Sequence, residues 1–522
     1  MIVIGADAKP YLVSDIVEDN AVWAADDPAI IFKDRTWTWR EFRDGMHTLR
    51  RGLSREGVVR GSRVAILERN CDEYILLHYA LASMGAILVP INIWLRTPEI
   101  AYILASSQPN MLVVGAEFAD TAAAAINALA DAPRLVFRGG ATSGHLRWSD
   151  LLAHGPSAAL STPASWDDPH IILYTSGTTG RPKGAIISHR RTVLDALAAS
   201  GAYGIRTGER FYCYMPLFHT GAWDYFKLFF YRRGAVVLAE RFDAEEAVEL
   251  IERHRCNGMF SVPLTLRQIV EAPSFAEADM SSMRFVAYGS YDPSNVMVRV
   301  LNAFRERGAH EVGITHVYGM TEAGPFISFM PPDRAEQKPG SIGRPLPGVQ
   351  LRLLDEEMKP VAAGETGEIC LRAPCLMSGY LNRPEATAEA FGGGWLHTGD
   401  LGRVDEEGDL HLVDRKKDMI RSGGENVFAK EVEQILIVHP AIRDCAVVGL
   451  PDADYGERVV AAVMLEETGA TDELEVIAYV RQRIAGFKTP RQIFFVEEFP
   501  RTPAGKIQKH LLRESLLLSA VS

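Results

Sequence analysis

The sequence Tyr174-Thr-Ser-Gly-Thr-Thr-Gly-Arg-Pro-Lys-Gly-Ala185 is rich in groups that bind anions. It contains three glycines, four hydroxyl side chains and two cations, Arg181 and Lys183. The backbone N–H groups of a glycine-rich loop, hydroxyl donors and positive charge together suit a polyphosphate. A flexible Gly/Ser/Thr turn is the alternative interpretation, but a match over twelve residues favours a phosphate loop.

This loop differs from the P-loop of nucleoside triphosphatases. A P-loop requires Gly-Lys-Ser/Thr at the start of a helix. Here Lys183 precedes Gly184 and the strand-like Ala185-Ile-Ile187, and a helix is expected only after Ser188. The sequence therefore predicts a phosphate loop that connects two strands.

Outward from this loop, short apolar runs alternate with helical stretches. The strand Val64–Leu67 precedes a helix over Asp72–Met84, and a further helix opens at Thr97-Pro98 with Thr as N-cap. This alternation predicts an α/β fold. Residues 340–414 change to short strands punctuated by Gly and Pro, and the residues beyond 418 predict a small α+β domain. We expect an N-terminal domain over residues 1–415 with a distal β-rich part, a C-terminal domain over 416–522, and a hinge near 414–417.

Composition narrows the class of protein further. The 522 residues are 47% hydrophobic and 23% charged, with a net charge of 55 − 67 = −12, which argues against nucleic acid or an anionic membrane as the main partner. Six cysteines without a CxxC pair indicate neither a disulfide framework nor a zinc ribbon. The N-terminus has no basic region typical of a signal peptide, so a cytoplasmic location is expected. The uncharged stretch Tyr74–Leu95 is long enough to span a bilayer, but its polar, Gly and Pro interruptions favour a helix followed by a strand.

Six further blocks follow in a fixed order along the chain: Met215–Gly221, Tyr318–Ala323, Gly340–Pro345, Trp395–Asp400, Asp414–Asp418 with Ser422–Asn426, and Pro500–Lys506. Together with the loop, they resemble the adenylate-forming enzymes, which comprise acyl- and aryl-CoA synthetases, peptide-synthetase adenylation domains and firefly luciferase. The resemblance covers nearly the whole chain. It implies that a carboxylate attacks the α-phosphate of ATP to give an acyl-adenylate and pyrophosphate, after which a thiol displaces AMP.

The resemblance implies roles for the residues that contact the phosphates. Thr321 would donate to the α-phosphate, and Glu322 would bind Mg²⁺ through a hard carboxylate oxygen. Tyr318, next to Gly319, would offer a flat face to adenine. As an alternative, Tyr318 is a core aromatic and Glu322 a solvated surface charge. The β- and γ-phosphates would contact the loop residues Thr175, Ser176, Gly177, Thr178, Thr179, Gly180 and Lys183.

Further roles concern the nucleoside. Asp400 would accept hydrogen bonds from the ribose hydroxyls, unless it is only a turn aspartate. Arg415 would contact the ribose or a phosphate. Gly289 and Ser290 would follow the adenine through backbone atoms. This strip departs from the family's common Gly-Gly-Ala-Pro, so Tyr288 is a candidate for the acyl pocket instead.

The C-terminal blocks contain the residues that would act in the two successive half-reactions. Lys506 would deliver a positive charge to the carboxylate and α-phosphate during adenylation. Lys417 matches the hinge position at which the domain rotates between the two half-reactions. In the second state, Gly423 and Gly424 would leave room for the phosphopantetheine arm of coenzyme A.

Two residues in or just after Met215–Gly221 are candidates for contact with the carboxylic acid substrate. His219 separates the carboxylate end of the acyl pocket from the thiol tunnel in relatives, and we assign it no general-base role. Trp223 lies four residues later, at a spacing similar to the gate tryptophan of some fatty acyl-CoA synthetases. The buried face of a helix accounts for Trp223, Tyr225 and Phe226 equally well.

The predicted function is therefore that of an ATP-dependent, AMP-forming acyl-CoA synthetase that uses Mg²⁺ and coenzyme A. Its substrate is a small-molecule carboxylic acid with a medium or long chain or an aryl group. The alternatives are an acyl-AMP ligase that loads a separate carrier protein, and a non-catalytic nucleotide or acyl sensor. The presence of Thr321, Glu322, Asp400 and Lys506 argues against the sensor. Motifs alone do not separate these ligases from a luciferase-like oxygenase.

Overall fold

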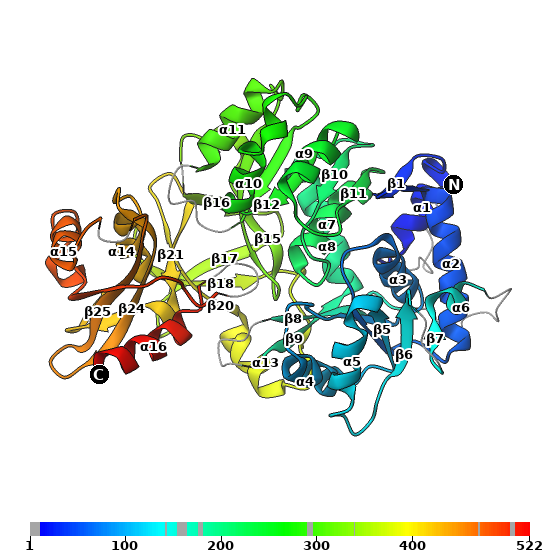
Figure 1. Ribbon diagram of the computed structural model, residues 1–522, viewed down its shortest axis with the longest axis horizontal. Coiled ribbons are helices and arrows are strands. Elements are labelled where there is room, and N and C mark those ends of the chain that lie inside the picture. The colour runs from blue at the N-terminus through cyan, green and yellow to red at the C-terminus, as the bar shows by residue number, and fades with distance from the viewer. Residues whose placement is uncertain are drawn as a thin grey trace.

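The computed structural model describes residues 11–140, 144–153, 164–175, 181–289, 296–338, 340–467, 470–501 and 507–521. Two extended sheets form a large N-terminal part, and a third sheet forms a smaller C-terminal part (Figure 1). Tyr74–Leu95 contains most of helix α3 (Asp72–Ser83) and then strand β4 (Ile87–Pro90), as predicted. No helix within the described ranges is both long and apolar enough to cross a membrane.

The first sheet has eight strands, in the order β19-β9-β8-β4-β3-β5-β6-β7. The strands from β8 to β7 are parallel, whereas β9 pairs antiparallel with β8 and β19 antiparallel with β9. The phosphate loop therefore connects two antiparallel strands, as its sequence predicts. The other strand bounds are β3 (Arg63–Leu67), β5 (Met111–Gly115), β6 (Arg134–Arg138), β7 (Leu146–Arg147), β8 (Pro169–Thr175), β9 (Lys183–Ser188) and β19 (Gly379–Tyr380).

The second sheet has thirteen strands, in the order β17-β18-β20-β21-β16-β15-β14-β13-β12-β10-β11-β1-β2. Strands β1 and β10 to β14 are parallel, and the remainder pair antiparallel. The predicted β-rich part is thus an extension of this sheet. The bounds are β1 (Pro28–Phe32), β2 (Arg35–Thr38), β10 (Arg210–Cys213), β11 (Ala235–Leu238), β12 (Gly258–Ser261), β13 (Phe285–Tyr288), β14 (Gly313–Met320), β15 (Gly324–Phe329), β16 (Ser341–Pro345), β17 (Gln350–Leu354), β18 (Gly367–Arg372), β20 (Leu396–Val404) and β21 (Leu410–Arg415).

Helices cover both faces of these sheets, as parallel strands require. Helix α2 begins with a capping box in which Thr38 and Glu41 bond each other's backbone. The remaining helices of this part are α1 (Asp15–Trp23), α2 (Trp39–Arg55), α4 (Thr97–Ser107), η1 (Ala116–Phe118), α5 (Ala119–Ile126), α6 (Trp148–Leu152), α7 (His189–Ala202), α8 (Thr220–Phe230), α9 (Ala244–Arg253), α10 (Pro263–Val270), η2 (Pro273–Ala276), α11 (Val296–Glu306), α12 (Pro332–Ala335), α13 (Pro384–Ala390) and η3 (Gly392–Gly394).

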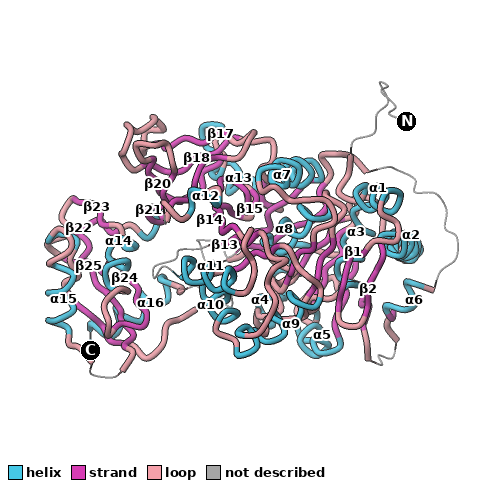
Figure 2. The backbone as a smooth tube through the Cα atoms, turned by 90° about the horizontal axis from the view of Figure 1, so that it is seen from above, coloured by secondary structure: helices cyan, strands magenta, loops and turns pink. Residues whose placement is uncertain are grey.

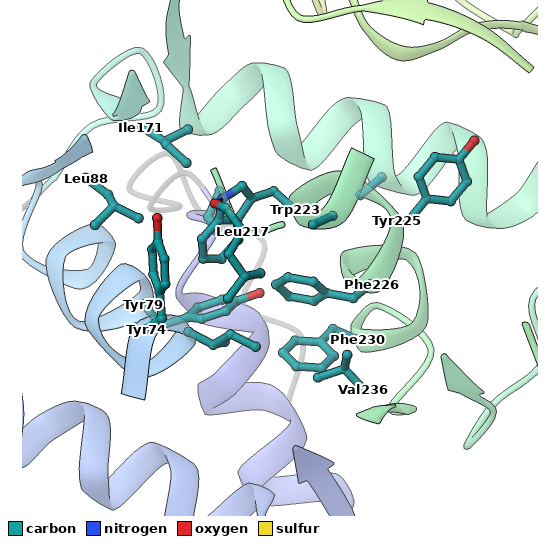
Figure 3. Packing of buried hydrophobic residues seen from close by; sticks show 14 of the residues in the cluster. Tyr74, Tyr79, Leu88, Ile171, Leu217, Trp223, Tyr225, Phe226, Phe230 and Val236 are labelled. Carbon is teal, nitrogen blue, oxygen red and sulfur yellow. Dashed lines mark hydrogen bonds between the residues drawn. The ribbon is translucent and has the colours of Figure 1, made fainter. Parts of the chain in front are cut away.

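The main core lies between the two large sheets, where α3 packs on β4 and β8 and α8 packs on β10 and β11. Figure 3 shows Trp223, Phe226 and Phe230 of α8 directed towards Tyr74 and Tyr79 of α3, while Tyr225 points away. Every residue of α8 is buried. A helix enclosed in this way holds its first turn, which faces the site, in a fixed place.

The C-terminal sheet is formed by β22 (Ile420–Ser422), β23 (Glu425–Val427), β24 (Ile442–Asp452), β25 (Gly456–Leu465) and β26 (Gln492–Phe495). Helices α14 (Ala429–Leu436) and α15 (Glu473–Arg481) cover one face, and α16 (Lys509–Val521) covers the other (Figure 2). The short helices η4 (Lys416–Asp418) and η5 (Gly486–Lys488) complete this part. It is the small α+β domain that the sequence predicts.

Candidate active site

The two ends of the phosphate loop meet a buried carboxylate. Thr175 and Lys183 are register partners on β8 and β9, and Thr175 Oγ1 donates to Glu322 Oε1 at 3.5 Å. Tyr380 donates its hydroxyl to the same oxygen at 2.8 Å, and the Lys183 ammonium lies 5.0 Å from the centre of the Tyr380 ring. Loop residues 176–180, which include Ser176, lie outside the described residues. The structure thus brings Thr175, Lys183 and Glu322 together at the end of β8.

Sequence reasoning missed Tyr380. Burial, the carboxylate of Glu322 and the hydrogen bond to it raise the pKa of this phenol, so the hydroxyl stays protonated and donates. Tyr380 reaches Glu322 because β19 adds to the edge of the first sheet beside β9. No local pattern around Gly379-Tyr380 signals this contact, since it depends on the pairing of two distant strands.

Glu322 lies in a tight turn between β14 and β15. Ala323 N donates to Met320 O at 3.2 Å, which leaves Thr321 and Glu322 as the two central residues of the turn. Glu322 is buried, so it is not the solvated surface charge of the alternative interpretation. Among the described residues, Thr175 and Tyr380 both donate to Oε1, and a hard, buried carboxylate oxygen beside a cation-rich loop fits a Mg²⁺ ligand.

A second buried carboxylate, Asp400, lies on β20. Tyr318 on β14 donates to its Oδ2 at 2.8 Å, and Arg415 Nε on β21 pairs with its Oδ1 at 3.0 Å. Burial and the negative charge of Asp400 raise the pKa of Tyr318. Each carboxylate oxygen has two lone pairs, so each can accept a further hydrogen bond beyond those from Tyr318 and Arg415, which suits a ligand with two hydroxyl groups. The structure brings together these three predicted nucleoside residues.

Two glycines lie where the backbone must approach closely. A Cβ on Gly319 would lie 2.3 Å from Pro325 Cα, so no other residue fits there. Gly289 N donates to Ser261 O at 3.2 Å, and a Cβ on Gly289 would lie 3.3 Å from the ring of Phe260. Ser290 lies outside the described residues. Tyr288 is buried and stacks on His316, with ring centres 4.5 Å apart.

His219 caps the first turn of α8. Its Nδ1 accepts from Gly221 N at 3.0 Å, which places the proton of the neutral ring on Nε2. Desolvation by the surrounding protein lowers the pKa of His219, although part of the residue is exposed to solvent. The negative charge of Asp224 opposes this shift. A neutral ring with an Nε2–H donor at the entrance to α8 suits contact with a polar reacting group better than proton abstraction.

Trp223 is an interior residue with 1% of its surface exposed. Its indole N–H donates to Leu217 O, and its ring lies 4.3 Å from that of His78 on α3. Lys227, one turn further along α8, places its ammonium 5.4 Å from the indole. These contacts support the core interpretation of Trp223, and its role as an acyl gate stays a prediction.

The segment that joins the two parts follows β21. Lys416 Nζ donates to the buried Glu368 Oε2 at 2.9 Å, while Lys417 is exposed. Gly423 and Gly424 form the two-residue turn between β22 and β23, with φ of 62° and 84°. Both are left-handed, which favours glycine. Lys506 lies outside the described residues.

Comparison with known proteins identifies the family of this chain. The sequence pattern of the AMP-binding enzyme family matches residues 17–381, and that of the AMP-binding enzyme C-terminal domain matches residues 431–506. The chain is 34% identical to the indoleacetate–CoA ligase of Aromatoleum aromaticum over 504 residues, covering 96% of this chain and 98% of that protein. It is also 34% identical to the long-chain-fatty-acid–CoA ligase FadD13 of Mycobacterium tuberculosis, covering 88% and 90%.

Solved structures show the same architecture. The anthranilate CoA ligase AuaEII, in complex with anthranoyl-AMP, superimposes with a TM-score of 0.87 at 29% identity, covering 98% of both chains. The fold and the paired carboxylate sites thus define an adenylate-forming enzyme. The chain belongs to the AMP-binding enzyme family. The predicted family and fold class are both confirmed.

Proposed function

We propose that this protein is an ATP-dependent, AMP-forming acyl-CoA synthetase. It joins a carboxylic acid to ATP with loss of pyrophosphate and then transfers the acyl group from AMP to coenzyme A. The three named relatives are all CoA ligases, which supports this activity. All six cysteines are buried and free, and ATP and coenzyme A are cytoplasmic metabolites, which supports a cytoplasmic location.

The observation that best supports the proposal is the proximity of Glu322 to the two ends of the phosphate loop. Transfer at phosphorus requires in-line positioning and neutralisation of charge more than acid–base chemistry. Thr175 and Lys183 at the ends of the loop lie beside the Glu322 turn, so Glu322 would hold a Mg²⁺ ion that accompanies a triphosphate bound at this loop. Mg²⁺ supplies charge neutralisation when bound, and Thr321 in the same turn donates to the α-phosphate.

The remaining predicted residues bind the nucleoside and the acid. Asp400 and Arg415 bind the ribose, with Asp400 oriented by the Tyr318 hydroxyl. Gly289 and Ser290 follow the adenine, and His219 lies at the junction of acid and thiol. We place the domain boundary after Arg415, where β21 ends, with Lys417 as the hinge. Gly423 and Gly424 admit coenzyme A in the rotated state.

A screen for pyrophosphate release tests the function. The purified protein is incubated with MgATP and a panel of aryl, arylalkyl and straight-chain acids, each with and without coenzyme A. We expect release with at least one medium-chain, long-chain or aryl acid, and thioester formation only with coenzyme A. Release that does not lead to an acyl-CoA would instead favour loading of a separate carrier protein. The absence of release with every acid would leave the sensor hypothesis.

The adenylation lysine gives a sharper test. Lys506→Ala should slow acyl-AMP formation by roughly 10² to 10³, the loss typical of one preorganised charged donor. Thioester formation from supplied acyl-AMP should persist, because Lys506 acts only in the first half-reaction. Lys509→Ala is the matched control nearby, since Lys509 pairs with Glu433 within the C-terminal domain. An equal loss in both half-reactions would contradict the assigned role.

A further inference from the structure

Four charged side chains lie inside the protein between α7 and α8, behind the site. Arg191 and Asp195 belong to α7, and Asp224 and Lys227 belong to α8. At most 5% of each residue is exposed. Burying charges costs free energy that a well-packed apolar core would avoid, so such a group requires an explanation. We call these four residues the α7–α8 ion cluster.

The ion cluster contacts the first turn of α8. Arg191 Nη1 donates to Asp224 Oδ2 at 2.9 Å. The same oxygen accepts from Thr220 Oγ1 at 2.6 Å. Thr220 is the first residue of α8 and follows His219 directly. Arg191 therefore fixes, through Asp224, the turn that carries His219.

The other side of the ion cluster contacts the turn that carries Glu322. Gly324 ends this turn with φ of 84°, and its backbone lies directly against the cluster. A Cβ on Gly324 would lie 2.5 Å from Asp195 Oδ2 and 2.8 Å from Arg191 Nη2. Arg191 thus bonds Asp224, whose carboxylate also accepts from Thr220 at the start of α8, and its Nη2 lies close to the backbone of Gly324. We call the start of α8 and the Thr321–Gly324 turn the two walls of the site.

One pair of residues in the cluster is both charged and closely bonded. Arg191 and Lys227 hold the pKa of Asp224 below its usual value despite burial, so Asp224 is ionised. Burial raises the pKa of Asp195 to about 7 and lowers that of Lys227 to about 8. The Arg191–Asp195 separation of 3.9 Å is longer than the Arg191–Asp224 bond. The fixed charge pair is therefore Arg191 with Asp224.

We propose that Arg191 is a positioning residue for adenylation, which holds the His219 end of α8 and the Thr321–Gly324 turn at a fixed separation. The inference rests on the proposed function, because the two walls carry the residues assigned to the acid and to Mg²⁺. A displacement of about 1 Å between such walls is enough to slow a reaction by about 10²-fold. Arg191 itself contacts no substrate.

The test is a double-mutant cycle of Arg191→Met, Asp224→Asn and the double variant, measured as kcat/KM for pyrophosphate release. We expect each single variant to lose about 10- to 100-fold and the double variant to lose no more than either. The Mg²⁺ concentration for half-maximal rate should rise in Arg191→Met, and Arg191→Lys should recover part of the rate. Melting curves establish that each variant is folded at the assay temperature.

Arg284→Met is the matched control. Arg284 pairs with the buried Glu209 at the start of β13, at the opposite end of the strand from Gly289. Its loss should lower the melting temperature without changing the Mg²⁺ dependence. Additive losses in the cycle, or an Mg²⁺ dependence in Arg191→Met equal to that of the control, would overturn the inference.

A measurement independent of activity separates this inference from the proposed function. If the wild-type protein releases no pyrophosphate with any acid, the proposed function is wrong, and crystal structures of wild type and Asp224→Asn then decide the positioning role. A shift of the Gly324 turn relative to Thr220 supports it, and unchanged positions overturn it. Asp224→Asn preserves the side-chain shape, so it serves even if Arg191→Met does not fold.

Discussion

At the scale of single residues, Trp223 shows how one spacing supports two interpretations. It lies one helical turn after His219, which suits a gate beside the acid as well as a buried helix face. The structure encloses the indole between α8 and α3 and bonds its N–H to Leu217 O. A side chain packed and bonded in this way has little freedom to rotate.

We expect Trp223→Ala to lower the free energy of unfolding by about 3 to 5 kcal/mol, as for other large-to-small core changes. The order of preference among acids should stay unchanged. Chemical denaturation and kcat/KM across acids of increasing length measure the two effects. Trp23→Ala is the control, because 69% of Trp23 is exposed and its loss should barely affect stability. A changed chain-length profile with little loss of stability would restore the gate.

At the scale of elements, α3, β8 and α7 each place one histidine in the same buried region. The ring centres of His78 and His170 are 5.1 Å apart, and those of His170 and His189 are 5.2 Å apart. Burial lowers the pKa of all three, that of His189 to about 4, and Lys227 lowers them further, while Asp168 opposes this for His189. We call these residues the buried histidine row.

The row predicts a loss of stability in mild acid. Between the unfolded pKa of about 6.5 and the lowered folded values, the unfolded chain binds more protons, so stability falls as pH falls, by about 1.4 kcal/mol per pH unit for each histidine. Asp195, with its raised pKa, acts in the opposite direction between about pH 7 and 4. Glu68 and Glu73 also have pKa values raised by burial, so the contribution of the row is measured by removing one of its histidines.

Urea unfolding at pH 7.0 and 5.5 measures this effect. His78→Phe should show a smaller drop between the two pH values than the wild-type protein, because one buried titrating group is removed. His510→Phe is the control, since His510 is exposed near the start of α16. Equal drops in the wild-type protein and His78→Phe would exclude a contribution from His78.

At the scale of the whole molecule, the link after β21 holds the two parts in one arrangement. Lys416 pairs with Glu368 on β18 of the thirteen-stranded sheet, and Arg421 pairs with Glu356 in the segment between β17 and β18. In this arrangement the Gly423–Gly424 turn lies beside Tyr455 of its own domain. If the domain rotates about Lys417 as proposed, these pairs must break before transfer to coenzyme A.

Lys417→Pro and Gly424→Leu should both spare acyl-AMP formation and impair transfer to coenzyme A. Proline fixes φ at the hinge, and leucine fills the space assigned to the phosphopantetheine arm. Single-turnover assays of each half-reaction measure the two steps. Because Gly424 has a φ of 84°, any side chain there adds backbone strain, and Gly424→Ala is the control that isolates bulk from strain. A parallel fall in both half-reactions would show that the changes act on the fold.

Much of the chain is readable from sequence because local patterns carry the information. The order of strands and helices, the phosphate loop between two strands and the C-terminal α+β domain all follow from hydrophobic period, caps and glycines within short windows. The motifs then identify the family through their order. Element bounds are less accurate, since the strand expected over Val64–Leu67 begins at Arg63 and the helix expected over Asp72–Met84 ends at Ser83.

The amino-acid sequence by itself determined the family, the elements and most of the residues that meet at the site. Only the tertiary structure decided how they pair. Tyr380 reaches Glu322 across 58 residues and Tyr318 reaches Asp400 across 82, through strand orders that no local window specifies. Arg191 resembles any helical cation until α8 and the Glu322 turn enclose it. The physical reason is that side-chain charge, burial and bonding depend on neighbours that are distant in the chain.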